Sequence, residues 1–160
     1  MRIGILSDTH NKLARTLTAI ELLVAGGADV LIHCGDLTGP DIVQACAVRP
    51  CYFVFGNNDD CTELRHPMRE TGGTCLEWAG VIEIEGKRLG VTHGHLPREA
   101  RRLLAAQPDY FLFGHTHEPL DHREGLIRHI NPGALHRAAK YTVALLQPDT
   151  DSLHFLEVPR

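Results

Sequence analysis

The sequence has no long apolar run and no dense cluster of basic residues. The first apolar stretch, residues 3–6, is far too short for a secretory signal, and no later segment approaches the roughly 20 apolar residues that cross a bilayer. The formal net charge is −4, so electrostatic capture of nucleic acid or of an anionic membrane is not expected. We therefore expect a protein without a membrane segment and with no strong nucleic-acid signal.

Paired cysteine motifs and nucleotide-binding signatures are also missing. The five cysteines are odd in number and contain no CxxC pair, which argues against a disulfide framework and favours a reducing cytoplasm. The first predicted strand is not followed by GxGxxG, and the chain contains no GxxxxGK[ST]. A Rossmann-like nucleotide-binding module is therefore a poor interpretation.

The length and composition are those of an ordinary globular domain. The 160 residues are 43% hydrophobic and 22% charged, with no linker, repeat or low-complexity segment. We expect one domain that covers residues 1–160.

Short apolar runs, each followed by a polar loop, recur along the chain. They are rich in β-branched, aliphatic or aromatic residues and predict buried strands at 3–6, 30–34, 52–55, 89–92 and 110–113. Helical spacing of Leu13, Leu17, Ile20 and Val24 predicts a helix over 12–25, and shorter helices are predicted over 41–47 and 97–106. This alternation indicates a largely parallel α/β layer in the first part of the chain.

The later part of the chain has a strand-rich pattern. Residues 77–85 alternate in polarity, and Gly86-Lys87 reads as the turn of a hairpin. Further strands are predicted at 126–130, 142–146 and 152–158, whereas 60–73 and 120–125 are expected to be loops. The fold class is therefore α/β, with two packed sheets flanked by helices and the functional site at the carboxyl ends of strands.

A polar motif follows each of the five predicted strands directly, and ligands in open α/β sheets bind beyond such strand ends. In extended backbone, residues two apart point to the same side, so Asp8 and His10 would converge, as would His115 and His117. The candidate metal ligands are Asp8, His10, Asp36, Asn57, His93, His115 and His117. These nitrogen and oxygen donors suit Mn, Fe, Co, Ni or Zn. They are too many for one tetrahedral ion and suit two ions that share a carboxylate, although a single-metal hydrolase stays open.

Each motif alone has an ordinary explanation. Asp before a helix is usually an N-cap, and the Gly-Asp and Gly-Asn-Asn-Asp segments are usual turns. The remaining histidines outside the motifs are interpreted as scattered structural residues: His33, His66, His122, His129, His136 and His154. Only the ordered set of five motifs at strand ends favours a metal centre.

That ordered set resembles the five motifs of the calcineurin-like metallophosphoesterases, over residues 1–133 at least. The short length resembles their small bacterial and archaeal phosphodiesterase branch, which also includes the retromer subunit of the same fold. The resemblance implies a sandwich of two mixed β-sheets flanked by helices, a small phosphate-ester substrate and manganese as the first choice of metal. Small relatives often pair into homodimers, although the sequence itself does not reveal the oligomeric state. It also implies a division of ligands: Asp8, His10 and His117 for one ion, Asn57, His93 and His115 for the other, with Asp36 bridging.

One position departs from many members of that family. They have a histidine, taken as a general acid or substrate contact, where this chain has Asn58, and an amide cannot donate a catalytic proton at neutral pH. We therefore expect Asn58 to contact a phosphate oxygen. His95 is a candidate catalytic residue, and the alternative is that it only supports the neighbouring ligand His93. Asp59 is expected to order its own loop. In this hypothesis a hydroxide shared by the metals attacks phosphorus; the alternative is a non-catalytic metal-binding scaffold.

Overall fold

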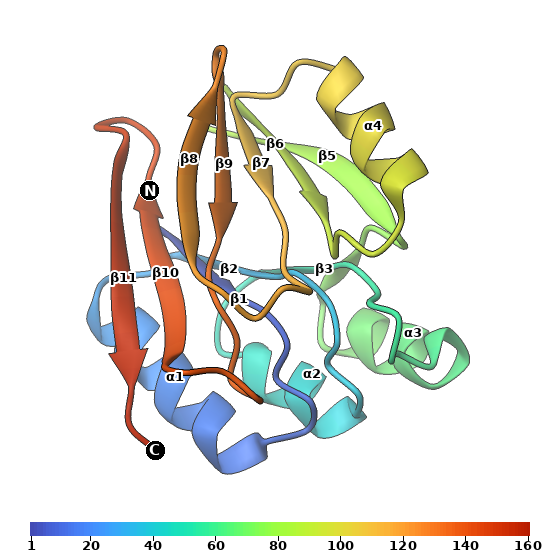
Figure 1. Cartoon of the computed structure of the whole chain (residues 1–160). Coiled ribbons are helices and arrows are strands. Elements are labelled where there is room, and N and C mark those ends of the chain that lie inside the picture. Colours follow the sequence, from blue (N-terminus) through green and yellow to red (C-terminus); the bar gives the residue numbers. More distant parts are fainter.

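Two mixed β-sheets pack face to face in the computed structural model, which describes residues 1–160 (Figure 1). Three helices cover the outer face of the first sheet, and one helix covers the outer face of the second. The helices are α1 (Leu13–Ala25), α2 (Pro40–Cys46), α3 (Cys61–Glu70) and α4 (Pro97–Ala105). None of them is both long and apolar enough to cross a membrane.

The first sheet has the strand order β11-β10-β1-β2-β3-β4. Its parallel part consists of β1 (Ile3–Leu6), β2 (Val30–His33), β3 (Cys51–Phe53) and β4 (Thr74–Cys75), while β10 (Tyr141–Gln147) and β11 (Ser152–Val158) add antiparallel pairs. Every residue of β1 is buried because both faces of this sheet are covered. Ile3 and Ile5 face the second sheet, whereas Leu6 packs with the helices.

The second sheet has the order β5-β6-β7-β9-β8. Its strands are β5 (Ala79–Ile84), β6 (Lys87–Thr92), β7 (Tyr110–Leu112), β8 (Leu120–Glu124) and β9 (Ile127–Asn131). Strands β6, β7 and β9 run parallel, and the two edge strands pair antiparallel. The predicted sandwich of two mixed sheets flanked by helices is therefore confirmed.

The buried face of α1 differs from the predicted one. Leu13 and Leu17 are 37% and 43% exposed, and the buried side chains are Thr16, Ala19, Ile20 and Leu23. Thr16 can face the core because its hydroxyl donates to the Lys12 carbonyl at 2.9 Å. The apolar pattern therefore predicts the helix correctly. The buried face is shifted by about one residue, to Thr16 and Leu23 in place of Leu17 and Val24.

Two segments expected to be loops are regular elements. Asp60 caps the N-terminus of helix α3, and its carboxylate accepts hydrogen bonds from the backbone of Thr62 and Glu63. Pro67 inside the helix conceals the helical signal, which is limited to the buried pair Leu64 and Met68. Strand β8 is exposed along its whole length, so it has no alternation from which a strand could be predicted.

The turn of the β5–β6 hairpin is one residue earlier than predicted. Glu85 and Gly86 occupy it with φ of 51° and 76°, and Ile84 pairs with Lys87 across it. Two consecutive residues at positive φ are the mark of a type I′ turn, whose twist suits a two-residue hairpin.

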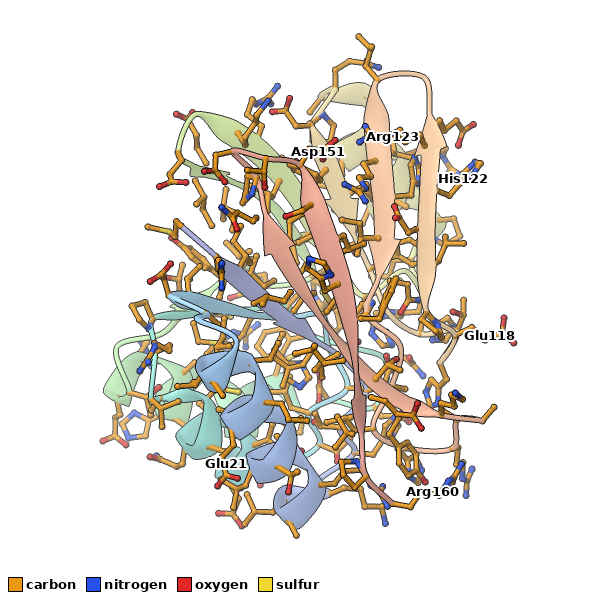
Figure 2. All side chains as sticks on the ribbon, turned by 90° about the vertical axis from the view of Figure 1, so that its left-hand side faces the viewer. Glu21, Glu118, His122, Arg123, Asp151 and Arg160 are labelled. Carbon is orange, nitrogen blue, oxygen red and sulfur yellow. The ribbon has the colours of Figure 1, made fainter.

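An arginine joins the two hairpins that close the sandwich. Arg128 on β9 donates two 2.8 Å hydrogen bonds to Asp121 on β8 and a 2.9 Å bond to Asp151 in the β10–β11 turn. Asp151 also accepts from Tyr110 at 2.8 Å and pairs with Arg123, which lies beside it in Figure 2. The Arg128 guanidinium holds the pKa of Asp121 below its usual range.

Replacement of Arg128 by Met should lower the free energy of unfolding at pH 7 by about 2 kcal/mol, since partly exposed carboxylates lose their partner. Asp121 has a lowered pKa in the folded state, so this stabilisation is present above its ordinary pKa of 3.8 and is lost as pH falls below it. Urea unfolding between about pH 7 and pH 2 should show the two proteins converging in acid. Arg101→Met is the control, and a gap independent of pH would contradict the assignment.

Candidate metal centre

The polar loops after β1, β2, β3, β6 and β7 meet at one end of the sandwich, but they come from two sheets rather than one. Hydrogen bonds join these loops to one another. The backbone of His115 donates to Asp8 Oδ2 at 3.0 Å and so connects the second sheet to the first. The backbone of Gly114 donates to the His93 carbonyl at 3.0 Å and connects two loops of the second sheet. The predicted convergence is real, and its cause is the packing of one sheet on the other.

The backbone at the candidate ligands is left-handed, not extended. The expectation that Asp8 and His10 converge through extended chain is wrong, since their φ angles are 52° and 43°. Asp36, His115 and His117 lie in the same region, with φ of 56°, 70° and 62°. Such residues are uncommon outside glycine, cost conformational energy and cluster at functional sites.

Asp8 lies at the centre of one group of candidate ligands. Its Oδ1 is 3.2 Å from His117 Nε2 and 3.9 Å from His10 Nε2. Asp8 is fully buried, and its other oxygen accepts a 2.6 Å hydrogen bond from Ser7. One carboxylate oxygen is therefore held by the protein, and the other faces the imidazoles of His10, His93 and His117.

Asp36 lies between two imidazoles. Its Oδ2 is 3.3 Å from His10 Nε2 and 3.4 Å from His93 Nε2. His93 Nε2 is in turn 3.8 Å from Asp8 Oδ1, so Asp8, Asp36 and His93 form a second group. This position of Asp36, between the two groups, is the one that a bridging carboxylate would need.

Three candidate ligand atoms in these groups lack a hydrogen-bond partner. Asp8 Oδ1, His10 Nε2 and His93 Nε2 are buried, and none makes a hydrogen bond of good geometry. A buried polar atom without a partner costs about 1–3 kcal/mol. Unpartnered oxygen and imidazole nitrogen atoms that converge in this way fit a divalent cation of the Mn, Fe, Co, Ni or Zn type.

The charges of the centre are strongly coupled. The carboxylates of Asp36 and Asp8 raise the pKa of His10 to about 9. Burial raises the pKa of Asp36, but the nearby imidazoles of His10 and His93 and two hydrogen bonds from Asn58 outweigh it and hold that pKa well below its usual range. Without metal, the centre therefore keeps both carboxylates ionised and a proton on His10.

Backbone carbonyls orient the imidazoles. His93 Nδ1 lies 2.8 Å from the Cys34 carbonyl, and His117 Nδ1 lies 3.3 Å from the Arg137 carbonyl. A proton on each Nδ1 would leave Nε2 of both rings free to bind a cation, the usual arrangement of metal-binding histidines.

Asp59 joins two of the loops, which goes beyond the expected role within its own loop. Its Oδ2 accepts from the backbone of Asp36 at 2.9 Å and of Gly56 at 2.8 Å. Its Oδ1 accepts from the backbone of Thr38 at 2.8 Å. Asp59 therefore fixes the β3 loop against the backbone that carries Asp36.

The other candidates line an open hollow of about 420 Å³ above these atoms. Asn57 and His115 are exposed at its wall, and the ring centroid of His115 is 5.1 Å from that of His93. Asn58 lines the same hollow, and its Nδ2 donates to Asp36 Oδ2 at 2.8 Å. The amide expected to contact substrate is thus engaged with Asp36 instead.

His95 lies beside the centre rather than in the hollow. Its ring centroid is 5.2 Å from that of His93 and 5.8 Å from that of Trp78. Its Nδ1 is buried without a partner, and burial lowers its pKa. The structure leaves both the catalytic and the supporting assignment of His95 open to experiment.

Two histidines interpreted as scattered belong to the centre. His33 is fully buried at the end of β2, where Nδ1 accepts from the Gly35 backbone at 3.2 Å and Nε2 lies 3.1 Å from Thr9 Oγ1. Burial lowers the pKa of His33 to about 3, so the ring is neutral. His136 lines the hollow and stacks on His10 at 4.5 Å. Neither residue stands in a recognisable motif, so only the fold could reveal them.

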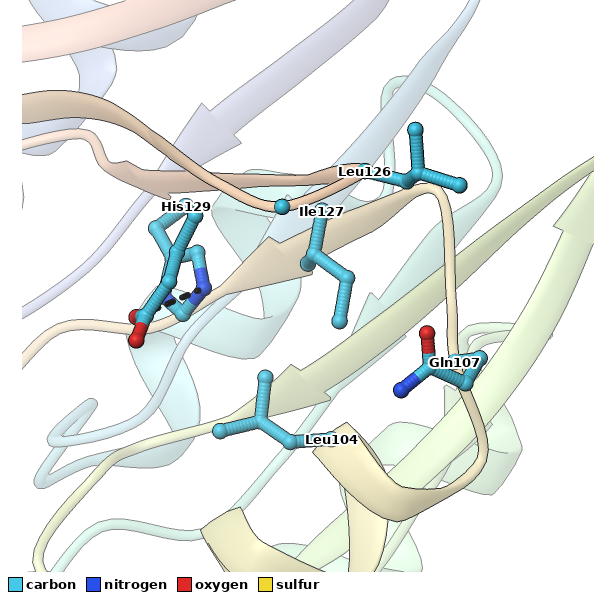
Figure 3. Close-up of a pocket in the computed structure, with 7 residues that line it drawn as sticks. Leu104, Gln107, Leu126, Ile127 and His129 are labelled. Atoms are coloured by element: carbon cyan, nitrogen blue, oxygen red, sulfur yellow. Dashed lines mark ion pairs between the residues drawn. The ribbon is translucent and has the colours of Figure 1, made fainter.

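A separate hollow of about 320 Å³ lies between the end of α4 and the β8–β9 hairpin (Figure 3). Leu104, Leu126 and Ile127 are its apolar walls, and a pair between His129 and Glu124 at 3.7 Å closes one side. It contains none of the candidate ligands, so it has no part in the chemistry of the centre.

Comparison with known proteins identifies the family. The pattern of the calcineurin-like phosphoesterase superfamily domain matches residues 1–151. The chain belongs to this superfamily. The metal-dependent phosphoesterase function expected from the motifs is confirmed at that level, and membership brings a requirement for divalent metal ions.

Named relatives of this phosphoesterase cover most of its length. Phosphodiesterase MJ0936 of Methanocaldococcus jannaschii is 28% identical over 83% of each chain. Phosphodiesterase YfcE of Escherichia coli is 29% identical over 84% of this chain and 79% of its own. A probable metallophosphoesterase of Methanothermobacter thermautotrophicus is 31% identical over 96% and 89%.

Solved structures agree in fold. An archaeal phosphodiesterase superposes on the phosphoesterase with a TM-score of 0.89 at 24% identity, covering 99% of this chain and all of its own. Vps29 of Entamoeba histolytica, complexed with zinc, superposes with a TM-score of 0.65 at 20% identity, covering 99% and 98%. At these identities the likeness establishes the architecture alone.

Gly56→Ala should reduce bound metal sharply, because a Cβ at this position would overlap the Asp36 carboxylate. Gly90→Ala is the matched control, since its added Cβ would meet Leu103 and Pro108 only at an ordinary 3.5 Å. Elemental analysis of both variants, with circular dichroism to verify folding, tests this. Full metal content in a folded Gly56→Ala protein would contradict the position given to Asp36.

Metal binding should release protons at neutral pH, because His10 has a pKa of about 9 without metal and must become neutral to bind a cation. The apparent affinity for Mn²⁺ should rise between pH 6 and pH 9, by up to about tenfold per pH unit for each displaced proton. Calorimetry in buffers of different ionisation enthalpy counts those protons. The exposed His66→Gln variant should behave as wild type, and binding without proton release would refute the assignment.

Proposed function

We propose that the protein is a phosphodiesterase that works through a dinuclear metal centre. The observation that carries the proposal is the position of Asp36, whose Oδ2 lies within 3.4 Å of both His10 Nε2 and His93 Nε2. The phosphodiesterase names of the relatives from M. jannaschii and E. coli support the substrate class. A small phosphate ester fits the polar hollow of about 420 Å³ above the centre.

The proposed ligands divide into two sets around Asp36. Asp8, His10 and His117 would hold one ion. Their ligand atoms lie within 4.8 Å of one another, which supports that set. His93, Asn57 and His115 would hold the other ion. Manganese is our first choice, with Ni, Fe, Co or Zn as alternatives. When bound, such a pair of ions supplies hydroxide near neutral pH and neutralises phosphoryl charge.

The side chains around the centre position the reacting groups. Ser7 and the His115 backbone hold Asp8, while Asn58 holds Asp36. In our proposal Asn58 also binds substrate. To contact a phosphate oxygen, its amide would have to release its hydrogen bond to Asp36.

The site offers no evident proton donor for the leaving group. Asn58 carries no acidic proton. In our proposal His95 is the catalytic residue, although it lies outside the hollow and burial lowers its pKa. The geometry therefore favours esters whose leaving alcohol departs without assistance.

Two further features belong to the proposal. The chain would function as one domain over residues 1–160. A cytoplasmic location is supported by its cysteines, all five of which are free. Pairing into a homodimer is supported only by the resemblance of the motifs to small members of the family.

The decisive experiment combines metal content with turnover. Protein purified without chelator should contain about two transition-metal ions per chain and hydrolyse bis(p-nitrophenyl) phosphate. Asp36→Asn should lose more activity than the roughly 10- to 100-fold caused by removing an outer partner of a ligand, whereas the exposed Asp149→Asn should not. Near-wild-type turnover of Asp36→Asn under saturating Mn²⁺ would refute the bridging role. Bound metal without turnover on a broad panel of esters would favour the non-catalytic scaffold.

A further inference from the structure

The segment between β9 and β10 forms part of the wall of the metal hollow, although no ligand motif lies in it. Arg137 in this segment is the only arginine or lysine that lines the hollow. Its side chain is exposed, and its guanidinium makes no hydrogen bond or ion pair within the protein. A permanently charged group therefore stands free beside the site proposed to bind a phosphate.

Neighbouring cations are occupied. Arg15 donates to the Leu135 carbonyl at 2.6 Å, and Lys140 pairs with Glu157 at 3.2 Å. Arg160 donates to the carbonyls of Ala138 and Ala139 and lies over the Tyr141 ring. Arg15, Lys140 and Arg160 thus have partners within the protein, whereas the Arg137 guanidinium has none.

The segment is held firmly against two of the candidate ligand loops. Asn131 is fully buried, and its Nδ2 donates to the Gly114 carbonyl and to Thr116 Oγ1, both at 3.0 Å. The backbone of Leu135 donates to the Asp8 carbonyl at 3.2 Å. A side chain on this segment is therefore placed by the same framework that places the candidate ligands.

The backbone of Arg137 contacts the centre directly. Its carbonyl oxygen lies 3.3 Å from His117 Nδ1, and its φ is 45°, in the left-handed region. Because the carbonyl is the group that contacts His117, truncation of the Arg137 side chain leaves this contact in place. The contribution of the guanidinium can thus be measured separately from the metal centre.

A second hollow of about 310 Å³ adjoins the first. It shares His117 and Arg137 with the metal hollow, and its other walls include Pro119, Ala138 and Lys140. This volume is at the lower end of the range of pockets that hold small ligands. Arg137 therefore stands at the boundary between the proposed reaction site and a space with both apolar and polar walls.

We propose that Arg137 binds a non-bridging oxygen of the substrate phosphate and that the adjoining hollow holds one of the two ester groups of a diester. This inference rests on the proposed phosphodiesterase function. A planar guanidinium donates two parallel hydrogen bonds to phosphate and carries a positive charge. The amide of Asn58 can donate hydrogen bonds but carries no charge. The hollow distinguishes a diester, which has a second organic group to place there, from a monoester.

The role of the guanidinium is tested with Arg137→Ala, Arg137→Lys and the control Arg101→Ala, an exposed arginine on α4 outside both hollows. All three should retain the wild-type metal content. Calorimetric titration of the metal-loaded proteins with inorganic phosphate should show binding weakened about tenfold or more by Arg137→Ala. Arg137→Lys should recover part of the loss. Equal phosphate affinity in Arg137→Ala and wild type would overturn the assignment.

The role of the hollow is tested by comparing two diesters with the same leaving group, methyl p-nitrophenyl phosphate and bis(p-nitrophenyl) phosphate. Ala138→Trp and the smaller Ala138→Leu should lower kcat/KM for the second substrate more than for the first. An unchanged ratio in a folded variant would overturn this part of the inference. Wild-type protein that binds metal but hydrolyses neither diester would instead refute the phosphodiesterase function, so the two failures are distinguishable.

Discussion

The whole site depends on one constraint, the burial of converging ligand atoms that the protein itself does not satisfy. Asp8 Oδ1, His10 Nε2 and His93 Nε2 are buried without a hydrogen bond of good geometry. Asp8 Oδ1 nevertheless lies 3.2–3.9 Å from three imidazole nitrogens. Such an arrangement is unfavourable by itself. It persists because both sheets, with their buried clusters, hold the loops in place.

Two polar side chains transmit that support from the sheets to the loops. Asp59 bonds the backbone of Gly56, Asp36 and Thr38, and so unites loops within the first sheet. In the second sheet, Asn131 donates to the Gly114 carbonyl and the Thr116 hydroxyl and accepts from the backbone N–H of Gly133. Each satisfies several backbone groups at once, which is how residues with left-handed backbone can be held at little net cost.

The sandwich could be predicted from the sequence because it leaves a local signal, and the same signal places the seven candidate ligands in loops after strands. Short apolar runs mark buried strands, and each run ends at a polar motif. Strand β8 and helix α3 could not be predicted, since an exposed edge strand lacks alternation and Pro67 interrupts the helical pattern. His33 and His136 act through contacts that only the packed sheets create. Local pattern likewise could not reveal the left-handed backbone at Asp8 and His10.

Neither Asn58 nor the unpaired Arg137 can donate a proton to a leaving group at neutral pH. A histidine can supply charge and a proton, whereas Asn58 supplies neither and already bonds Asp36. Arg137 can supply charge but never a proton at physiological pH. In our proposal, the hollow therefore recognises phosphate by permanent charge and leaves protonation of the departing alcohol to solvent or to the alcohol's own acidity. This separation of binding from proton transfer favours substrates with good leaving groups and makes the second ester group, rather than an acid, the basis of selectivity.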